Sequence, residues 1–269
     1  MATISDKLNQ LANQLWQFAP GTDQLCHPEE VRLVAHRGAH GIGPHGKLIE
    51  NTLPAFDLCL EHQLWGIELD IHQTLDGELV VHHDPHCGRL FDRPDIIIAG
   101  IDFQQLRSEI PQIPLLSEVV DRYAGNMHLM IEIKASWRDH PELPNRVEQQ
   151  LKNLAPTEDF HLLSLVPDYL EGFRCFPAEA LMDVAEFNTA EIMKQNRELG
   201  HGAIAGSFAL LTSAKINQLH RENRKIGTGM VENLGVLNRE VNRGVEWIFS
   251  NSAVKLMSEL RAAFYQKTP

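Results

Sequence analysis

Short apolar runs rich in β-branched residues alternate eight times with stretches of helical periodicity, and this alternation constrains the fold more than any other feature of the chain. We expect strands near residues 31–36, 66–71, 128–134, 160–165, 180–185, 202–207, 225–230 and 245–250. Helical patterns lie between or after them, at 52–64, 115–124, 145–154, 168–175, 189–199, 212–223, 234–243 and 253–265. Strands that alternate with helices pair in parallel, and eight such units in about 250 residues match a closed barrel. The sequence therefore predicts an α/β fold, a TIM-type (β/α)8 barrel.

The chain has no linker rich in Pro, Gly or Ser, so we expect one barrel domain over residues 28–269 and a helical extension over 1–27. Apolar residues at helical spacing in the extension predict an amphipathic helix over 3–18, packed against the outside or the closed end of the barrel. These residues are Ile4, Leu8, Leu11, Leu15 and Trp16. Residues 72–114 combine a hairpin signal at 75–77 with several prolines, which predicts an insertion after the second strand, on the catalytic side.

Two acids interrupt the second predicted strand. Because successive side chains of a strand point to opposite faces, Glu68 and Asp70 share one face, and the apolar residues between and beside them share the other. The third strand repeats the pattern, with Glu132 and Lys134 on one face. If both strands line one enclosed space, three carboxylates converge, and either proton uptake or a cation must relieve their repulsion. Carboxylate oxygens are hard ligands, so a cation there would be Mg²⁺, Ca²⁺ or Mn²⁺.

Histidines follow two of the apolar runs. His36 and Arg37 stand where the first strand runs into a glycine, although a short His-Arg-Gly is also compatible with residues satisfied at a strand end. His82 and His83 are consecutive, so only one of them can face inward, where Asp84 could orient it. Glu50 lies beside a helix start and could equally be an acid that interacts with the helix dipole.

Taken in order, these motifs resemble the signature of the glycerophosphodiester phosphodiesterase family. The resemblance is close over residues 33–134 and loose over the remainder. The elements that carry it are His36-Arg-Gly38, Glu50-Asn-Thr52 with Ala55-Phe56, Ile67-Glu-Leu-Asp70, Thr74-Leu-Asp-Gly77, Val80-Val81 with His83-Asp84, Pro114-Leu-Leu-Ser-Glu118 and Ile131-Glu-Ile-Lys134. Any one element is weak, but all of them in this order are specific.

The resemblance implies a TIM-like barrel that hydrolyses small glycerophosphodiesters to glycerol 3-phosphate and an alcohol with the help of a bound metal. It implies that Glu68, Asp70 and Glu132 ligate a Mg²⁺ or Ca²⁺ ion, with Glu50 beside or within that shell. The chemistry of the residues agrees, because hydrolysis of an anionic diester needs a cation to offset charge.

The same resemblance implies that His36 and His83 form a general acid/base pair and that Arg37 and Lys134 contact the phosphate. Imidazoles that titrate near neutral pH suit both proton transfers. Which histidine is the acid, and whether the nucleophile is water or a neighbouring glycerol hydroxyl that forms a cyclic phosphate, is open at this point.

Three segments depart from the family pattern. The loop before Glu50 is longer than usual, contains His40, Pro44, His45 and Lys47, and has Ile49 where the family has Pro. Near the end, Gly229–Glu232 replaces the family's Trp-Thr-Val-Asn, and Ser250-Asn251 replaces its Thr-Asp. The metal and acid/base residues are intact, so these changes bear on the pocket for glycerol or the leaving group more than on the reaction class.

Net charge and cysteine usage restrict the partners and the cellular location that we expect. A net charge of −12 without a run of Lys and Arg weighs against nucleic-acid partners and a polybasic membrane anchor. Four scattered cysteines and the lack of a secretory pattern favour a cytoplasmic protein, while the oligomeric state is open. His82, His83, His86 and Cys87 match no standard zinc spacing.

Two alternatives to a glycerophosphodiesterase are also considered. A lysophospholipase D-like enzyme would need an exposed apolar groove or lid, and no obvious one stands out in the sequence. A non-catalytic barrel that binds a phosphoryl ligand would have no need of both imidazoles beside the acids.

Overall fold

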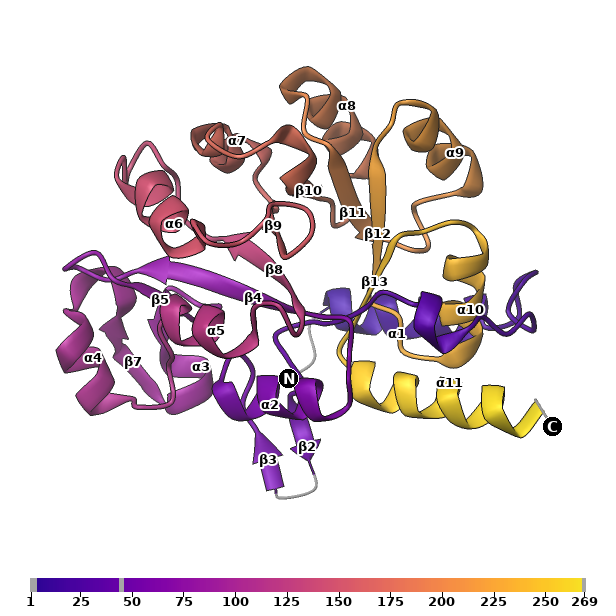
Figure 1. The fold of residues 1–269 in the computed structure, drawn as a ribbon, viewed down its shortest axis with the longest axis horizontal. Helices are drawn as coiled ribbons and strands as arrows, with labels where there is room; N and C mark the ends of the chain where they lie inside the picture. Colours follow the sequence, from indigo (N-terminus) through magenta and orange to yellow (C-terminus); the bar gives the residue numbers. More distant parts are fainter. Residues whose placement is uncertain (1–3, 44–45, 268–269) are drawn as a thin grey trace.

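Strand β1 (Leu33–Ala35) pairs in parallel with β4 on one side and with β13 on the other, which closes the barrel. The computed structural model describes residues 4–43 and 46–267 (Figure 1). The other barrel strands, in order, are β4 (Gly66–Gln73), β8 (His128–Ile133), β9 (Phe160–Ser164), β10 (Leu181–Val184), β11 (Ala203–Ser207), β12 (Lys225–Gly229) and β13 (Trp247–Ser250). The predicted (β/α)8 barrel is confirmed, and each of the eight expected strands is found.

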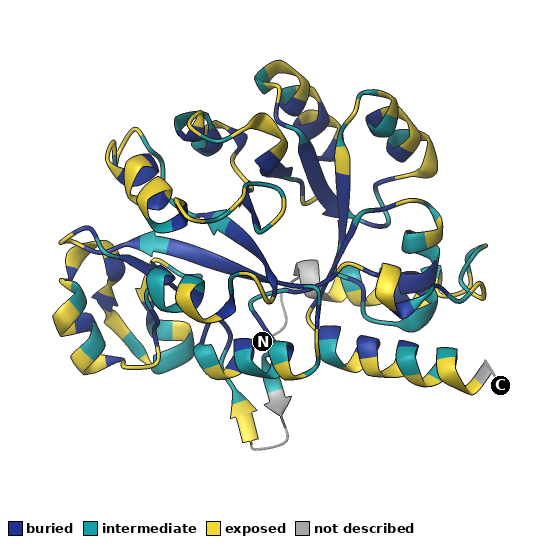
Figure 2. Ribbon diagram, viewed as in Figure 1, coloured by how far each residue is buried: buried dark blue, intermediate teal, exposed yellow. Residues whose placement is uncertain are grey.

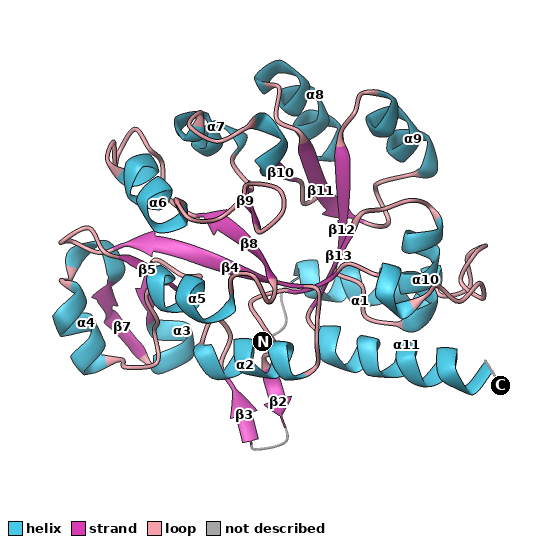
Figure 3. Cartoon of the chain, in the orientation of Figure 1, coloured by secondary structure: helices cyan, strands magenta, loops and turns pink. Residues whose placement is uncertain are grey.

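Helices surround the barrel, as Figure 3 shows. They are α2 (Leu53–Glu61), α5 (Leu116–Tyr123), α6 (Leu143–Leu151), α7 (Pro167–Leu170), α8 (Thr189–Leu199), α9 (Ser213–Arg221), α10 (Leu234–Asn242) and α11 (Ala253–Lys267). Their buried sides face the strands in Figure 2 and pack on outward-pointing residues of the sheet such as Ile67, Leu69 and Ile71. Within the described residues, no helix combines the length and the apolar character needed to cross a membrane.

The barrel interior changes character along its axis. Its middle is apolar, with Val34, Met130 and Leu163 packed against one another. The open end, at the carboxyl ends of the strands, carries the carboxylates of Glu68 and Asp70. An apolar layer therefore separates the polar side chains of the open end from the rest of the barrel interior. Barrel enzymes build their active sites at this end.

The closed end of the barrel holds a pair of buried histidines. The His128 Nε2 atom lies 2.8 Å from Nδ1 of His161, and the two rings are flanked by Trp65 and Trp247. Burial lowers the pKa of His128 to about 4, and burial together with the repulsion that a protonated His128 would exert lowers the pKa of His161 to about 3. Both rings are therefore neutral in the folded protein at neutral pH.

The predicted insertion after the second strand is also confirmed. Strand β4 continues into a hairpin with the antiparallel β5 (Leu79–Val81). The insertion then adds β6 (His86–Cys87), α3 (Gly88–Phe91), β7 (Arg93–Ile97) and α4 (Phe103–Glu109), which pack on a small apolar core of their own. In the loop before Glu50, β2 (Gly41–Gly43) and β3 (Gly46–Leu48) form a hairpin that the sequence did not predict. Pro44 and His45 of that loop lie outside the described residues.

The predicted N-terminal helix is present as α1 (Ile4–Trp16), but the prediction of which face it buries is wrong. Leu8, Leu11 and Leu15 are 47%, 51% and 57% exposed, whereas the polar Asn13 is only 4% exposed. Only Trp16 of the expected apolar stripe, among its residues whose burial is described, packs against the main core.

The predicted position of α1 is wrong as well, because the helix docks at the open end of the barrel. Asn13 Nδ2 donates to the Met230 carbonyl (2.9 Å), and Asn13 Oδ1 accepts from the Glu232 backbone N–H (2.8 Å), both just past β12. The physical reason is that this loop has backbone groups that need partners, and an asparagine can satisfy a donor and an acceptor at once.

The buried histidine pair predicts a loss of stability in acid. Below the ordinary histidine pKa of 6.5, the unfolded chain takes up protons that the folded protein does not bind, so the free energy of unfolding falls as the pH drops from 6.5 toward the folded-state values. Between pH 6.5 and pH 5, each such histidine costs about 2 kcal/mol. We expect urea unfolding of His161→Leu to show a decrease between pH 7 and pH 5 that is smaller than the wild-type decrease by about this amount. Equal decreases in the two proteins would contradict this account.

Candidate active site

Three carboxylates meet at the open end of the barrel. Asp70 on β4 is the register partner of Glu132 on β8, and Glu68 lies two residues before Asp70 on the same strand. One carboxylate oxygen from each of the three lies within 4.8 Å of the others. The structure therefore brings together Glu68, Asp70 and Glu132, which we call the acidic triad.

Two cations offset part of the charge of the acidic triad. Lys134 Nζ lies 3.0 Å from Asp70 Oδ1 and 2.7 Å from Glu132 Oε1. Burial would raise the pKa of Asp70, but Lys134 and Arg37 hold it below its usual range. Burial and the Asp70 charge raise the pKa of both Glu68 and Glu132. Fully ionised, the triad would thus carry more negative charge than Lys134 and Arg37 neutralise.

The donor set of the triad fits a divalent metal. Glu68 Oε1 and Asp70 Oδ1 are buried, and neither makes a hydrogen bond to any residue in the described part of the chain, although the Lys134 ammonium is an ionic neighbour of Asp70. Buried, unpaired carboxylate oxygens are ligands that hard cations such as Mg²⁺ and Ca²⁺ prefer. No other group of three or more His, Cys, Asp or Glu side chains among the described residues has its ligand atoms this close together.

Arg37 joins the first strand to the triad through its backbone and its side chain. It adopts a left-handed conformation (φ 57°), followed by Gly38 at φ 77°, and its N–H donates to Glu68 Oε2 (2.9 Å). Its guanidinium donates to Glu50 Oε1 (3.0 Å), and its Nε lies 3.3 Å from Asp70 Oδ2. Residues other than glycine rarely adopt this backbone conformation, and those that do are concentrated at functional sites.

Glu50 is bound by arginines. Arg89 donates to both of its carboxylate oxygens, at 2.6 and 3.1 Å, and Arg37 donates to one of them. Burial alone would raise the pKa of Glu50, but the two arginines lower it to about 2. Glu50 therefore stands beside the triad as the anchor of two arginines. The sequence reasoning missed Arg89, which comes from α3 in the insertion and follows no recognisable motif.

Asn51 is a second residue that the sequence reasoning did not select. Its Nδ2 donates to Asp70 Oδ2 at 2.7 Å, and its Oδ1 accepts from the Asp70 N–H at 3.3 Å. The helix start expected beside Glu50 is α2, and Thr52 is its N-cap. The left-handed backbone of Asn51 (φ 57°) turns its amide toward the triad instead.

His36 lies between the triad and the last barrel strand. Its Nε2 is 3.9 Å from Glu68 Oε2, and its Nδ1 is 2.8 Å from the amide oxygen of Asn251, just past β13. Because an amide oxygen can only accept, Nδ1 carries the proton and Nε2 is left unprotonated. Burial, with the Arg37 charge, lowers the pKa of His36 to about 4, so the ring is neutral at neutral pH.

His83 is oriented by a carboxylate, as its neighbour in the sequence suggested. Its Nδ1 lies 2.7 Å from Asp84 Oδ1, and Arg89 donates to the other Asp84 oxygen at 2.7 Å. His82 instead is buried, with its Nε2 near the His86 carbonyl (3.3 Å). Of the two histidines, His83 is the one whose pKa is affected by the charges of Asp70, Lys134 and Arg37, so it is the one that approaches the site. His82, His83, His86 and Cys87 do not bring three ligand atoms together in the described structure.

The comparisons with known proteins agree on one family. Residues 36–226, more than half of the chain, match the family model described as the glycerophosphoryl diester phosphodiesterase family. A glycerophosphodiester phosphodiesterase of Bacillus altitudinis is 26% identical over 252 residues, which cover 86% of this chain and 100% of that protein. One from Bacillus subtilis is 31% identical over 135 residues, 44% of each chain.

Solved structures share the fold. A glycerophosphodiester phosphodiesterase from Thermotoga maritima has a TM-score of 0.70 at 22% identity and covers 86% of this chain and 98% of that one. A phosphodiesterase from Oleispira antarctica, in complex with the product sn-glycerol-3-phosphate, has a TM-score of 0.71 at 20% identity, with coverages of 86% and 96%. At these identities the likeness shows the fold alone.

The turn that carries His36 and Arg37 depends on Gly38, and substitution of this glycine tests that dependence. A Cβ atom at Gly38 (φ 77°) would lie 2.8 Å from the Phe56 ring, whereas at Gly200 (φ 81°) it would meet nothing within 4 Å. We expect Gly200→Ala to lower the free energy of unfolding by about 1 kcal/mol through backbone strain alone. Gly38→Ala should cost about 2 kcal/mol more because of overpacking. Urea unfolding measures both, and equal losses would show that the contact with Phe56 does not constrain the turn.

Proposed function

The chain belongs to the glycerophosphoryl diester phosphodiesterase family, and we propose that it hydrolyses small glycerophosphodiesters to sn-glycerol 3-phosphate and an alcohol. The observation that carries this proposal is the acidic triad, in which the buried Glu68 Oε1 has no partner among the described residues, with His36 and His83 beside it. A phosphodiester is anionic and needs a cation, a base and an acid, and the open end of the barrel offers residues for all three. The product complex of the Oleispira antarctica phosphodiesterase is consistent with this substrate class.

Glu68, Asp70 and Glu132 would hold one divalent cation, Mg²⁺ or Ca²⁺, and the same oxygen donors would also accept Mn²⁺. When bound, the ion offsets negative charge on the nonbridging oxygens of the phosphate. Arg37 and Lys134 supply further positive charge at the same place, and we assign phosphate contacts to them. Glu50 has both oxygens occupied, so its role is to position Arg37 and Arg89.

We assign the proton transfers to the two imidazoles. His36 exchanges protons through Nε2, because its Nδ1 proton is donated to Asn251. His83 is held by Asp84, whose carboxylate can stabilise an imidazolium. One ring takes the proton of the attacking hydroxyl, and the other delivers a proton to the oxygen that leaves. A protein that only binds a phosphoryl group would need neither ring in this arrangement.

One observation favours a second candidate activity, hydrolysis of lysophospholipids that keep one acyl chain. The exposed Leu8, Leu11 and Leu15 of α1 form an apolar stripe on a helix that docks at the open end of the barrel. This stripe offers a surface that an acyl chain could contact, which the sequence alone did not show.

Loss of the imidazole tests the proposed acid/base pair. We expect His83→Ala and His36→Ala each to lower kcat by about 10²- to 10⁴-fold, measured as release of sn-glycerol 3-phosphate, because proton transfer contributes this much. Metal affinity should remain near wild type, since neither ring is in the acidic triad. His86→Ala is the matched control, because its exposed ring belongs to the same loop and bonds only the Gly88 N–H among described residues. Near-normal turnover by His83→Ala would remove the proposed role.

Chelation and pH test the metal site. EDTA should abolish turnover, and Mg²⁺ or Ca²⁺ should restore it. Because burial and mutual repulsion raise the pKa of Glu68 and Glu132, these groups must release protons to bind the ion, so affinity should fall from pH 8 to pH 6. For each carboxyl group that must lose a proton, the metal affinity falls by about tenfold for every pH unit below the pKa of that group.

Calorimetry in two buffers that differ in ionisation enthalpy counts the protons released on metal binding. Glu132→Gln keeps the size of the side chain but cannot titrate, so it should bind the ion more weakly and release fewer protons. A wild-type affinity that does not change between pH 8 and pH 6 would contradict the assignment of these carboxylates.

A further inference from the structure

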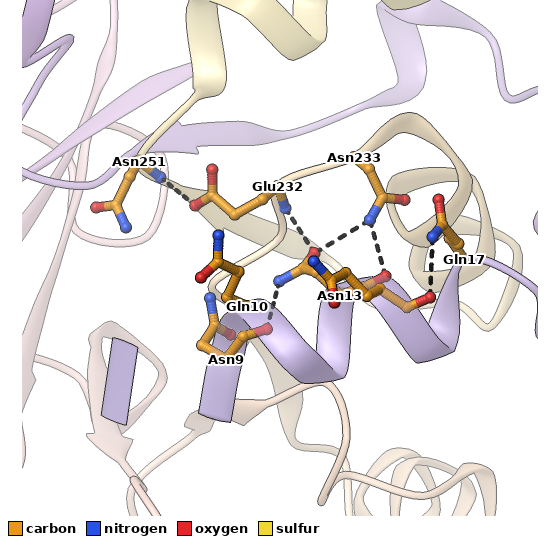
Figure 4. A pocket seen from close by; sticks show the side chains of 8 residues that line it. Asn9, Gln10, Asn13, Gln17, Glu232, Asn233 and Asn251 are labelled. Atoms are coloured by element: carbon orange, nitrogen blue, oxygen red, sulfur yellow. Dashed lines mark hydrogen bonds between the residues drawn. The ribbon is translucent and has the colours of Figure 1, made fainter. Parts of the chain in front are cut away.

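A polar cavity of about 530 Å³ lies at the open end of the barrel, between α1 and the loops that follow β12 and β13 (Figure 4). Seven of the eight residues that line it carry side-chain amides, and the other is a glutamate. They are Asn9, Gln10, Asn13, Gln14, Gln17, Glu232, Asn233 and Asn251. We call this cavity the amide pocket. Among the described residues, no aromatic, aliphatic or cationic side chain belongs to this lining.

The amide pocket adjoins the proposed catalytic centre through one shared residue. Asn251 borders the pocket, and its amide oxygen accepts from Nδ1 of His36 at 2.8 Å. The other nitrogen of the same ring lies 3.9 Å from Glu68 of the acidic triad. A substrate whose phosphorus lies at the triad can therefore extend past His36 into the pocket with the alcohol that it carries.

Hydrogen bonds hold one wall of the pocket rigid. Asn13 Oδ1 accepts from the Glu232 N–H (2.8 Å), and Asn233 Nδ2 donates to the Asn13 carbonyl (3.1 Å). The Glu232 carboxylate accepts from the Ser252 hydroxyl (2.5 Å) and from the Asn251 N–H (3.2 Å). These contacts keep α1 docked and Glu232 in place without a ligand.

Other amides of the pocket are available to a ligand. The side chains of Asn9, Gln10 and Gln14 make no hydrogen bond to any residue that the structure describes, and Figure 4 shows Asn9 and Gln10 extending from α1 toward Glu232. Each amide can donate two hydrogen bonds and accept two. Together with the Glu232 carboxylate, they offer both donors and acceptors to a neutral polar group.

The chemistry of this lining selects among possible alcohols. Neighbouring hydroxyls, which donate and accept, are matched by amides and a carboxylate. A quaternary ammonium is recognised by aromatic rings, an acyl chain by apolar side chains and an anion by cations, and the described lining of the pocket offers none of these. The volume lies within the range of small-molecule sites and exceeds what a three-carbon alcohol fills.

We infer that the amide pocket binds an uncharged, hydroxyl-rich leaving alcohol, such as a cyclic polyol, and that α1 thereby sets the head-group preference of the enzyme. This inference rests on the proposed function. It gives the N-terminal extension a role in substrate selection through Asn9 and Gln10, while Asn13 fixes the helix in position.

The test compares two diesters that differ only in the alcohol, sn-glycero-3-phosphoinositol and sn-glycero-3-phosphocholine, with the double variant Asn9→Ala/Gln10→Ala. Asn13 is left intact so that α1 stays docked. We expect kcat/KM for the inositol diester to fall about tenfold, mainly through KM, because two hydrogen-bonding amides are lost. Turnover of the choline diester should be unchanged.

The double variant Asn145→Ala/Gln149→Ala on α6 is the matched control, because it truncates the same two side-chain types at exposed positions and should leave both substrates unaffected. If Asn9→Ala/Gln10→Ala lowered kcat/KM equally for both diesters, or for neither, the inference would be overturned. The proposed function would still hold in that case, provided that the wild-type enzyme releases glycerol 3-phosphate. If the wild-type enzyme with Mg²⁺ or Ca²⁺ released none from either diester, the proposed function itself would fail.

Discussion

The mutual repulsion of three carboxylates at one end of a barrel, two of them buried, is the constraint on which the site depends. Glu68, Asp70 and Glu132 bring their oxygens within 4.8 Å of one another in a place that solvent hardly reaches. Such an arrangement persists only where nearby positive charge or proton uptake relieves the repulsion. Lys134 and Arg37 supply part of this charge, and the remaining repulsion, together with the unpartnered Glu68 Oε1, accounts for the affinity that we propose for a divalent ion.

Two additions to the barrel complete the surroundings of the triad. The insertion after β4 contributes His83 with Asp84, and Arg89, which bonds both Asp84 and Glu50. On another side, α1 from the N-terminal extension builds the amide pocket that reaches His36 through Asn251. In our proposal the barrel provides the residues for the metal and the phosphate, and the added segments supply groups that orient the imidazoles and that would contact the alcohol.

Sequence reasoning succeeded for the features that follow from local periodicity in the sequence. The eight strands follow from apolar runs, and the shared face of Glu68 and Asp70 follows from strand alternation. It failed for α1, because the apolar stripe of Leu8, Leu11 and Leu15 suggested the wrong buried face. A short helix is positioned by the partners that its polar groups find as well as by its apolar residues, and Asn13 meets the unpaired backbone of a loop more than two hundred residues away.

By itself, the sequence determined the barrel, the insertion, the residues of the triad and the two imidazoles, because these follow from periodicity and from an ordered set of short motifs. Only the tertiary structure decided that Glu50 is bound by two arginines, that an amide contacts His36 and that α1 lines a polar pocket. Those contacts join residues such as Glu50 with Arg89, and His36 with Asn251, which lie 39 and 215 positions apart. No local pattern encodes such pairs, because barrel closure and loop packing alone bring them together.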